Sequence, residues 1–118
     1  MMDCSFPKSN RILKALEFQN ILNRGQRVVS KELVVIGMKT EAEAARLGLI
    51  VSRKVGKATI RNRIKRQLRE YFRVQKQDFS GTDIVVIARH TAGQSVDLPE
   101  AFAACLHRLQ PRIRRQVN

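Results

Sequence analysis

The order of apolar and polar residues in the first half of the chain predicts one helix followed by extended chain. Apolar side chains three and four residues apart over 13–24 predict the helix, and Gly25 follows as its C-terminal stop. The stretch Val28–Met38 is rich in β-branched residues and is long enough to form two strands. A further strand is predicted over Arg46–Arg53, where apolar residues alternate along one face.

The second half of the chain predicts two helices around one buried strand. A long helix is expected over about 58–75, after which Asp83–Ala88 is almost continuously apolar, as expected when both faces of a strand are covered. Asp97 is suited to cap a last helix, which Pro111 is expected to end. The order α-β-β-α-β-α, with one stretch divisible into two strands, predicts an α+β or α/β sandwich of few layers.

Length and composition indicate one domain. The 118 residues leave no room for a second sizeable core, and 43% apolar residues are enough for a compact one. We therefore expect a single domain over 1–118, with basic, disordered ends at 1–8 and 111–118.

The charge balance indicates a polyanionic partner. Lys and Arg number 23 against 10 Asp and Glu, and the formal net charge of +13 repels itself on so small a domain unless a polyanion is bound. Nucleic acid is the leading partner, and an anionic membrane surface is a distant second. Arg outnumbers Lys, and its planar guanidinium suits phosphate.

The cations concentrate in and before the long helix. The stretch 53–73 holds nine Lys or Arg and one acid, Glu70. At helical spacing its apolar side chains gather on one side. Beside them runs a row of cations four residues apart: Arg61, Lys65, Arg69 and Arg73. Like charges at this spacing destabilise an isolated helix by about 0.2–0.5 kcal/mol per pair, so the row favours a face neutralised by phosphates over a merely solvated one.

The sequence offers little chemistry of other kinds. No segment is apolar enough for a signal peptide or a membrane span, and Cys4 and Cys105 form no CxxC pair, so we expect a reduced, cytoplasmic setting. His90 and His107 have no carboxylate or nucleophile partner close in sequence. Cys105 and His107 lack further ligands for zinc, so neither a catalytic residue nor a protein-bound metal is predicted.

Two blocks of the sequence resemble a known family. Residues 46–58 are RLGLIVSRKVGKA, and residues 61–70 are RNRIKRQLRE. Together they resemble the signature of the bacterial ribonuclease P protein subunit. Three shorter segments agree with the same family, at 6–13, 17–25 and 83–89.

The resemblance implies an α+β fold, an α-β-β-β-α-β-α two-layer sandwich with a left-handed βαβ crossover, of the ribosomal protein S5 domain 2-like type. It implies a subunit of ribonuclease P, the ribonucleoprotein endonuclease (a hydrolase) of tRNA processing that removes the 5′ leader of precursor tRNA. In this family a large catalytic RNA carries the active site, with Mg²⁺ held by the RNA and substrate phosphates. The implied partners are that RNA and the leader; no protein partner is inferred, and the protein alone is not expected to be catalytic.

The resemblance also assigns residues to two surfaces. The RNA-binding residues would be Arg53, Lys54, Lys57, Arg61, Asn62, Arg63, Lys65, Arg66 and Arg69. A cleft for the single-stranded leader would be lined by Phe18, Leu22, Ile36 and Ser52. Relatives often carry aromatic residues in place of Leu22 and Ile36, so leader contacts here should depend more on apolar packing than on stacking. Helical spacing alone would make Phe18 a core residue.

A ribosomal or DNA-binding protein that uses the same basic helix is the alternative. No RNA-recognition aromatic pattern, GxxG loop or zinc-finger spacing supports a named module of another kind. Only the block Arg61-Asn62-Arg63 separates the two interpretations in the sequence. A tightly bound RNA of several hundred nucleotides would favour the first, and a preference for duplex DNA would favour the second.

Overall fold

The computed structural model describes residues 11–12, 14–94 and 97–114. The expected disorder of 1–8 and of the chain beyond residue 114, and the expectation for Cys4, lie outside the described residues.

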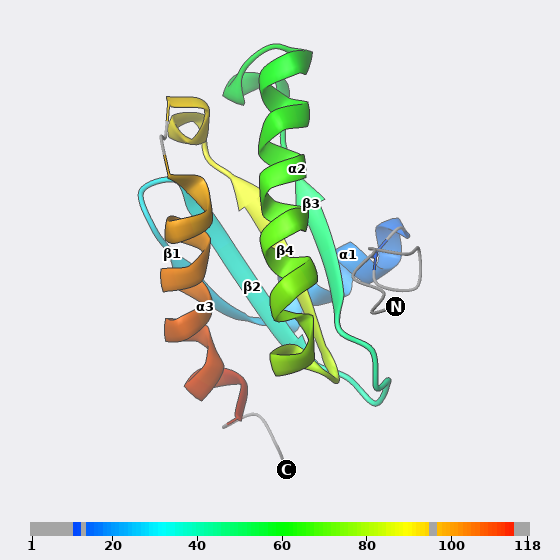
Figure 1. Ribbon diagram of the computed structural model, residues 1–118. Helices are drawn as coiled ribbons and strands as arrows, with labels where there is room; N and C mark the ends of the chain where they lie inside the picture. Colours follow the sequence, from blue (N-terminus) through cyan, green and yellow to red (C-terminus); the bar gives the residue numbers. More distant parts are fainter. Residues whose placement is uncertain (1–10, 13, 95–96, 115–118) are drawn as a thin grey trace, which may run out of the picture.

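Within the described residues, three α-helices and four strands make up the fold (Figure 1). The strands are β1 (Gln26–Val29), β2 (Leu33–Lys39), β3 (Arg46–Ile50) and β4 (Thr82–Ala88). The helices are α1 (Ala15–Arg24), α2 (Ala58–Gln75) and α3 (Leu98–Arg114). Short 3₁₀ turns connect them: η2 (Arg53–Val55), η3 (Lys76–Phe79) and η4 (His90–Gln94).

The four strands form one sheet in the order β1-β2-β4-β3. The pairs β1–β2 and β2–β4 are antiparallel, whereas β3 and β4 are parallel and are joined through α2. Figure 1 shows β3 to the right of β4, both strands running upward, and α2 in front of them. A right-handed connection would place the second strand on the right, so this crossover is left-handed, which confirms the expected exception to the usual rule.

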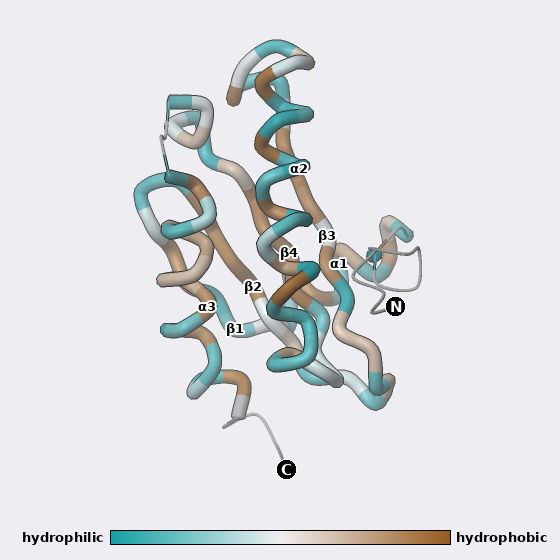
Figure 2. The backbone as a smooth tube through the Cα atoms, viewed as in Figure 1, coloured by the Kyte–Doolittle hydropathy of each residue, from teal (hydrophilic) through white to brown (hydrophobic). Residues whose placement is uncertain are grey.

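One face of the sheet packs against α2 and α3 and forms the main core. Alternate strand residues such as Leu33, Val35, Ile84 and Val86 are fully or almost fully buried there. They meet the apolar stripes of the helices: Ile64, Leu68, Phe72, Phe102, Leu106 and Leu109. Figure 2 shows the hydrophobic strands running behind these helices. No helix in the described part of the chain combines the length and the apolarity needed to cross a membrane.

The opposite face of the sheet is only partly covered, by α1. A smaller cluster forms there around the buried side chains of Ile12, Ile21, Ile36 and Val85. The near-continuous apolar character of β4 is thereby explained, because its alternate residues serve two different clusters.

Hydrogen bonds set the ends of two predicted strands. The stretch 28–38 is two strands, as the sequence allowed, because the Ser30 hydroxyl accepts hydrogen bonds from the backbone N–H groups of Glu32 and Leu33, at 3.3 and 3.0 Å. The strand predicted over Arg46–Arg53 ends earlier, at Ile50. There the Val55 N–H donates to the Ser52 carbonyl at 3.1 Å, so the chain turns out of the sheet before the basic helix.

The last helix does not end at Pro111, and that expectation was wrong. Asp97 does cap its start, since its carboxylate accepts a hydrogen bond from the Glu100 N–H at 3.2 Å. Pro111 lies inside α3, which continues to Arg114. The reason is tertiary packing: Ile113 is only 4% exposed, and a Cβ built on Gly37 of β2 would lie 2.7 Å from its side chain. Burial of Ile113 thus offsets the backbone hydrogen bond that proline removes.

This packing predicts a large loss of stability when the side chain of Ile113, which follows the proline, is shortened. Ile113→Ala should lower the free energy of unfolding by about 2–4 kcal/mol, because it leaves a cavity over Gly37. Val74→Ala, at a side chain 63% exposed on α2, is the control and should change stability by less than about 0.5 kcal/mol. Urea denaturation of both variants measures the difference; equal, small effects would show that the end of α3 is not packed.

Candidate nucleic-acid interface

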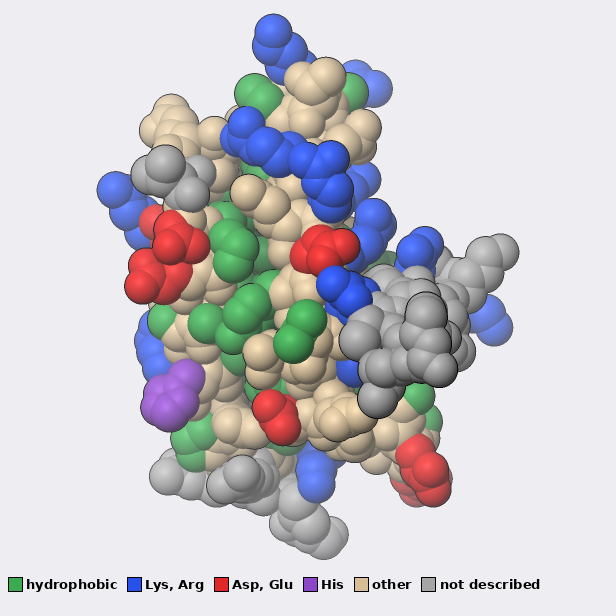
Figure 3. Space-filling view, viewed as in Figure 1, with side chains coloured by type: hydrophobic (Ala, Val, Ile, Leu, Met, Phe, Trp, Pro, Cys, Tyr) green, Lys and Arg blue, Asp and Glu red, His purple; other side chains and the backbone are tan. Residues whose placement is uncertain are grey.

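The outward side of α2 is almost wholly cationic. The predicted amphipathic pattern is confirmed: Ile64, Leu68 and Phe72 face the core. The exposed or half-buried cations of the helix are Arg61, Arg63, Lys65, Arg66, Arg69 and Arg73. Asn62 is exposed among them, and Figure 3 shows Lys and Arg side chains gathered over the upper part of the helix. This surface is called the α2 face below.

Backbone carbonyls orient two arginines at the start of α2. Gly56 has φ +156°, a conformation that other residues rarely adopt, and its carbonyl accepts a hydrogen bond from Arg61 Nε at 3.1 Å. Arg63 Nη2 donates to the Gly93 carbonyl at 3.5 Å, so this arginine leans toward η4. The predicted entry residues are all exposed around the turn: Arg53, Lys54 and Lys57.

The fourth cation of the predicted row differs from the other three. Arg73 Nη2 lies 2.8 Å from Glu70 Oε1, and so it pairs with the one acidic residue of α2. The three remaining members of the row form no ion pair with another residue of the described ranges: Arg61, Lys65 and Arg69.

A hollow of about 210 Å³ connects the α2 face to the first helix. Its lining comes from α1, α2, β3 and the segment before α1: Arg11, Ile12, Phe18, Leu47, Leu49, Lys65 and Arg69. Burial lowers the pKa of Arg69, and the nearby charge of Arg11 lowers it further. Clustered cations beside apolar side chains suit a nucleotide, whose phosphate is anionic and whose base has flat faces that stack on apolar and aromatic groups.

Close backbone approach seats α1 on the sheet at both of its ends. A Cβ on Gly48 of β3 would lie 2.6 Å from a ring carbon of Phe18. At the other end, a Cβ on Gly25 would lie 2.5 Å from the Ile36 side chain on β2. The two glycines therefore let α1 lie flat across β3, β4 and β2, above the cross-strand row of Gly48, Val85 and Ile36.

An ion triad fixes the same helix in place. Arg46 of β3 donates to both carboxylate oxygens of Asp83 on β4, from Nε at 2.9 Å and from Nη2 at 2.7 Å. Its Nη1 donates to Glu17 Oε2 of α1 at 3.0 Å. The hydrogen bond to Asp83, partly opposed by burial and assisted by Glu17, raises the pKa of Arg46. The triad matters for α1 because Lys14, at the N-cap, supplies no side-chain hydrogen bond.

Beside α1, one row of apolar side chains stays partly uncovered. Ile50, Ile87, Val34 and Val29 are direct cross-strand neighbours from β3 to β1. Ile50, Ile87 and Val34 are half-buried and pack against the α1 cluster, and Val29 is 44% exposed. These four residues form a strip of partly exposed apolar surface beside α1, and this strip together with Phe18 and Leu22 of α1 is called the cleft below.

The cleft contains two of its predicted residues and excludes one. Phe18 and Leu22, four residues apart on α1, are half-buried against the same cluster. Ser52 is exposed just after β3, at the end of the strip. Ile36 was predicted wrongly as a lining residue, because it is 0% exposed beneath α1 and Gly25 and offers no surface to a ligand.

Sequence reasoning missed most of the strip. Val34, Ile50 and Ile87 were interpreted only as strand residues. A signal existed in the apolar residues at the second set of alternate positions of each strand. This signal could not be used without the pairing register of the strands, which places Val34 and Ile50 on either side of Ile87.

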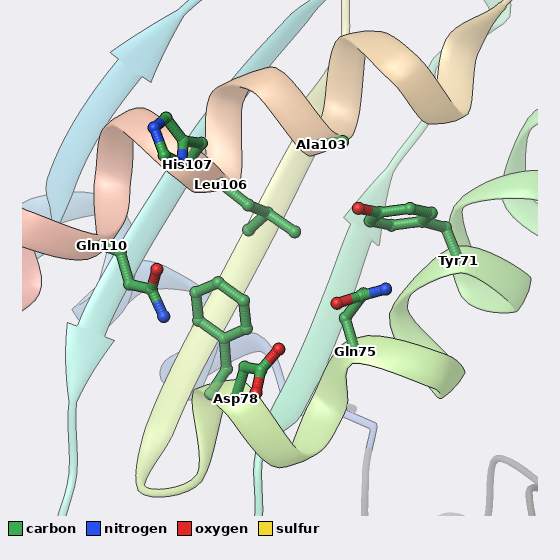
Figure 4. Close-up of a pocket in the computed structure, with 8 residues that line it drawn as sticks. Tyr71, Gln75, Asp78, Ala103, Leu106, His107 and Gln110 are labelled. Carbon is green, nitrogen blue, oxygen red and sulfur yellow. The ribbon is translucent and has the colours of Figure 1, made fainter.

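A second hollow, between α2 and α3, has a different character. Figure 4 shows Tyr71, Gln75 and Asp78 facing Leu106, His107 and Gln110 across it. Its volume is about 170 Å³, and no Lys or Arg lines it. It therefore lacks the cations that a phosphate site requires, unlike the hollow beside Phe18.

The chain matches the family model described as Ribonuclease P over residues 6–110. The chain belongs to the ribonuclease P protein family. Two similar relatives are the ribonuclease P protein components of Staphylococcus haemolyticus and Desulfosudis oleivorans. The first is 45% identical over 72% of this chain and 75% of its own length, and the second is 41% identical over 88% of each.

Solved structures of the ribonuclease P family share the fold. The Staphylococcus aureus ribonuclease P protein superposes with a TM-score of 0.74 at 36% identity, over 86% of this chain and 93% of that one. The Thermotoga maritima protein gives 0.69 at 33% identity, over 87% and 96%. The predicted family and fold are confirmed, and the chain is a protein subunit of the ribonuclease P endoribonuclease and a partner of its RNA. A ribosomal or DNA-binding role is not favoured.

The ion triad predicts a large loss of stability when its buried carboxylate, Asp83, loses its charged partner. Arg46→Ala should cost about 3 kcal/mol of unfolding free energy, because the Asp83 side chain, 3% exposed, loses its partner. Glu70→Gln breaks an ion pair with a carboxylate side chain that is 63% exposed, and should cost less than about 1 kcal/mol. Chemical denaturation compares the two. Similar, small losses would mean that Arg46 does not hold the strands and α1 together.

Proposed function

We propose that this ribonuclease P subunit assists removal of the 5′ leader from precursor tRNA by holding two RNAs on two surfaces. The α2 face binds the catalytic RNA, and the cleft beside α1 binds the single-stranded leader. The observation that carries the proposal is the contrast between the surfaces: α2 presents cations in rows, and the cleft presents half-buried apolar side chains with Phe18 among them.

The chemistry of each surface suits its RNA. A structured RNA presents phosphates at the surface of its helices, and a rigid helix with cations at regular spacing can contact several of them at once. A leader has unpaired bases, and the faces of these bases can lie on apolar and aromatic side chains. The hollow lined by Phe18, Lys65 and Arg69 joins the two surfaces, so both RNAs can be bound side by side.

We assign the cleavage step to the RNA partner and place the complex in the cytoplasm. Within the described residues no group of three or more His, Cys, Asp or Glu side chains could hold a metal ion. The Mg²⁺ of the reaction is proposed to be held by RNA and substrate phosphates. His107 lines the hollow between α2 and α3 rather than the cleft.

Reconstitution tests the function as a whole. The chain, combined with the ribonuclease P RNA of its own genome and a precursor tRNA, should raise cleavage at low Mg²⁺ and low salt. The protein freed of RNA should not cleave. Site-specific cleavage by RNA-free protein, or no stimulation of the RNA, would contradict the proposal.

The α2 face predicts a change in salt dependence. Changing Arg61, Lys65 and Arg69 together to Ala should weaken binding to the catalytic RNA and reduce the log–log salt slope by about 0.7–0.9 for each phosphate that is no longer bound. Folding stability should hold or rise slightly, because like charges are relieved. Filter binding across a salt series measures the slope. Arg73→Ala is the matched control, since that cation pairs with Glu70, and an unchanged slope in the triple variant would remove the α2 face from the interface.

The cleft predicts a loss of affinity that is confined to tRNAs carrying a leader. Phe18→Leu keeps an apolar side chain over Gly48 but removes the aromatic surface, so affinity for precursor tRNA should fall about 5- to 50-fold, the worth of about one stacked base. Affinity for mature tRNA, which has no leader, should stay within about twofold. Leu16→Ala, at a side chain 84% exposed on the same helix, is the control. Equal losses for both tRNAs would make Phe18 a structural residue only.

A further inference from the structure

A second group of cations lies at the far end of the cleft, beyond the α2 face. It consists of five exposed side chains around β1 and the β1–β2 turn: Arg27, Lys31, Arg89, Arg108 and Arg112. None of the five forms an ion pair with another described residue. Glu32, which follows Lys31 directly in the sequence, is half-buried. The group is called the edge patch below.

Two of these arginines are held at the open edge of the sheet. β1 is an edge strand, so its outward carbonyls have no partner strand. Arg112 Nη1 donates to the Arg27 carbonyl at 2.6 Å, and Arg108 Nη1 donates to the Val29 carbonyl at 3.3 Å. Each guanidinium has five N–H donors, so most of them stay available to an anion.

The β1–β2 turn brings the other cations to the same edge. Arg89 Nη1 donates to the Ser30 carbonyl at 2.8 Å, and the Thr91 hydroxyl donates to the Lys31 carbonyl at 2.6 Å. The turn is thereby tied to the end of β4. The hydrogen bond to Ser30 thus holds the Arg89 guanidinium at the turn without neutralising its charge, and Lys31 stands exposed on the same turn.

The edge patch is continuous with the cleft. The strip of Ile50, Ile87, Val34 and Val29 ends at β1, where Arg108 caps the Val29 carbonyl. At about 4.8 Å between strands, the strip is about 14 Å long from β3 to β1. Its β3 end adjoins the entry of α2, so an apolar strip has cations at both ends.

We propose that the edge patch binds the phosphates of the leader segment that leaves the cleft across β1. The partner is single-stranded RNA, because the patch continues the apolar strip of the cleft, which suits unpaired bases, and its arginines, which form no ion pair within the described residues, suit phosphate. The inference rests on the proposed function and extends it: affinity depends on leader length, and nucleotides beyond the cleft contribute charge contacts rather than stacking.

Precursor tRNAs with two leader lengths test the patch, one of about 4 and one of about 12 nucleotides. The holoenzyme carrying Arg108→Gln and Arg112→Gln should lose affinity several-fold for the long leader and keep it for the short one. The salt slope for the long leader should fall by about 0.7 for each phosphate that the patch no longer binds. Glutamine keeps an amide that can still donate to the β1 carbonyls, and thermal unfolding checks that both proteins are folded.

The control removes one exposed cation elsewhere. Lys39→Gln, at the other end of β2, should leave both affinities unchanged and is compared with the single change Arg112→Gln. Equal losses of affinity for the two precursor tRNAs, or no loss for the one with the long leader, would overturn only the role proposed for the edge patch. If the unchanged holoenzyme does not separate precursor from mature tRNA, the proposed function itself fails.

Discussion

The contact between Arg46 and Asp83 is the interaction on which the two surfaces depend. Asp83 is almost completely buried on the central strand β4, so its carboxylate requires a charged partner, and Arg46 supplies two hydrogen bonds from the neighbouring strand. The remaining guanidinium nitrogen binds Glu17 and so positions α1. A buried charge that must be satisfied thereby fixes a helix whose own N-terminus is weakly capped.

The position of α1 then decides which part of the sheet stays open. The helix lies above the row of Gly48, Val85 and Ile36, where two glycines permit close approach, and it leaves the next row partly exposed. The other face is filled by α2 and α3, which turns the cations of α2 outward. The short η2 turn places the start of α2 just after the end of β3, next to the cleft. Cationic and apolar surfaces therefore meet at one edge of the molecule.

The sequence predicted elements and chemistry better than it predicted pairing. The basic helix over 58–75 followed from apolar periodicity and unmixed charge, which are local properties. Ile36 was misplaced and Ile87 overlooked because both depend on strand register and on where α1 lies. The end of α3 was predicted too early, at Pro111. The sequence shows that proline removes a backbone hydrogen bond, but it does not show that Ile113 is buried against β2.

The central claim is that one small domain binds two RNAs on separate surfaces. Photocrosslinking tests it most directly, with p-benzoylphenylalanine placed at Leu22 in the cleft or at Arg66 on the α2 face, in the holoenzyme with bound precursor tRNA. Position 22 is predicted to crosslink to the leader and position 66 to the catalytic RNA. Crosslinking of both positions to the same RNA would contradict the division of the two surfaces.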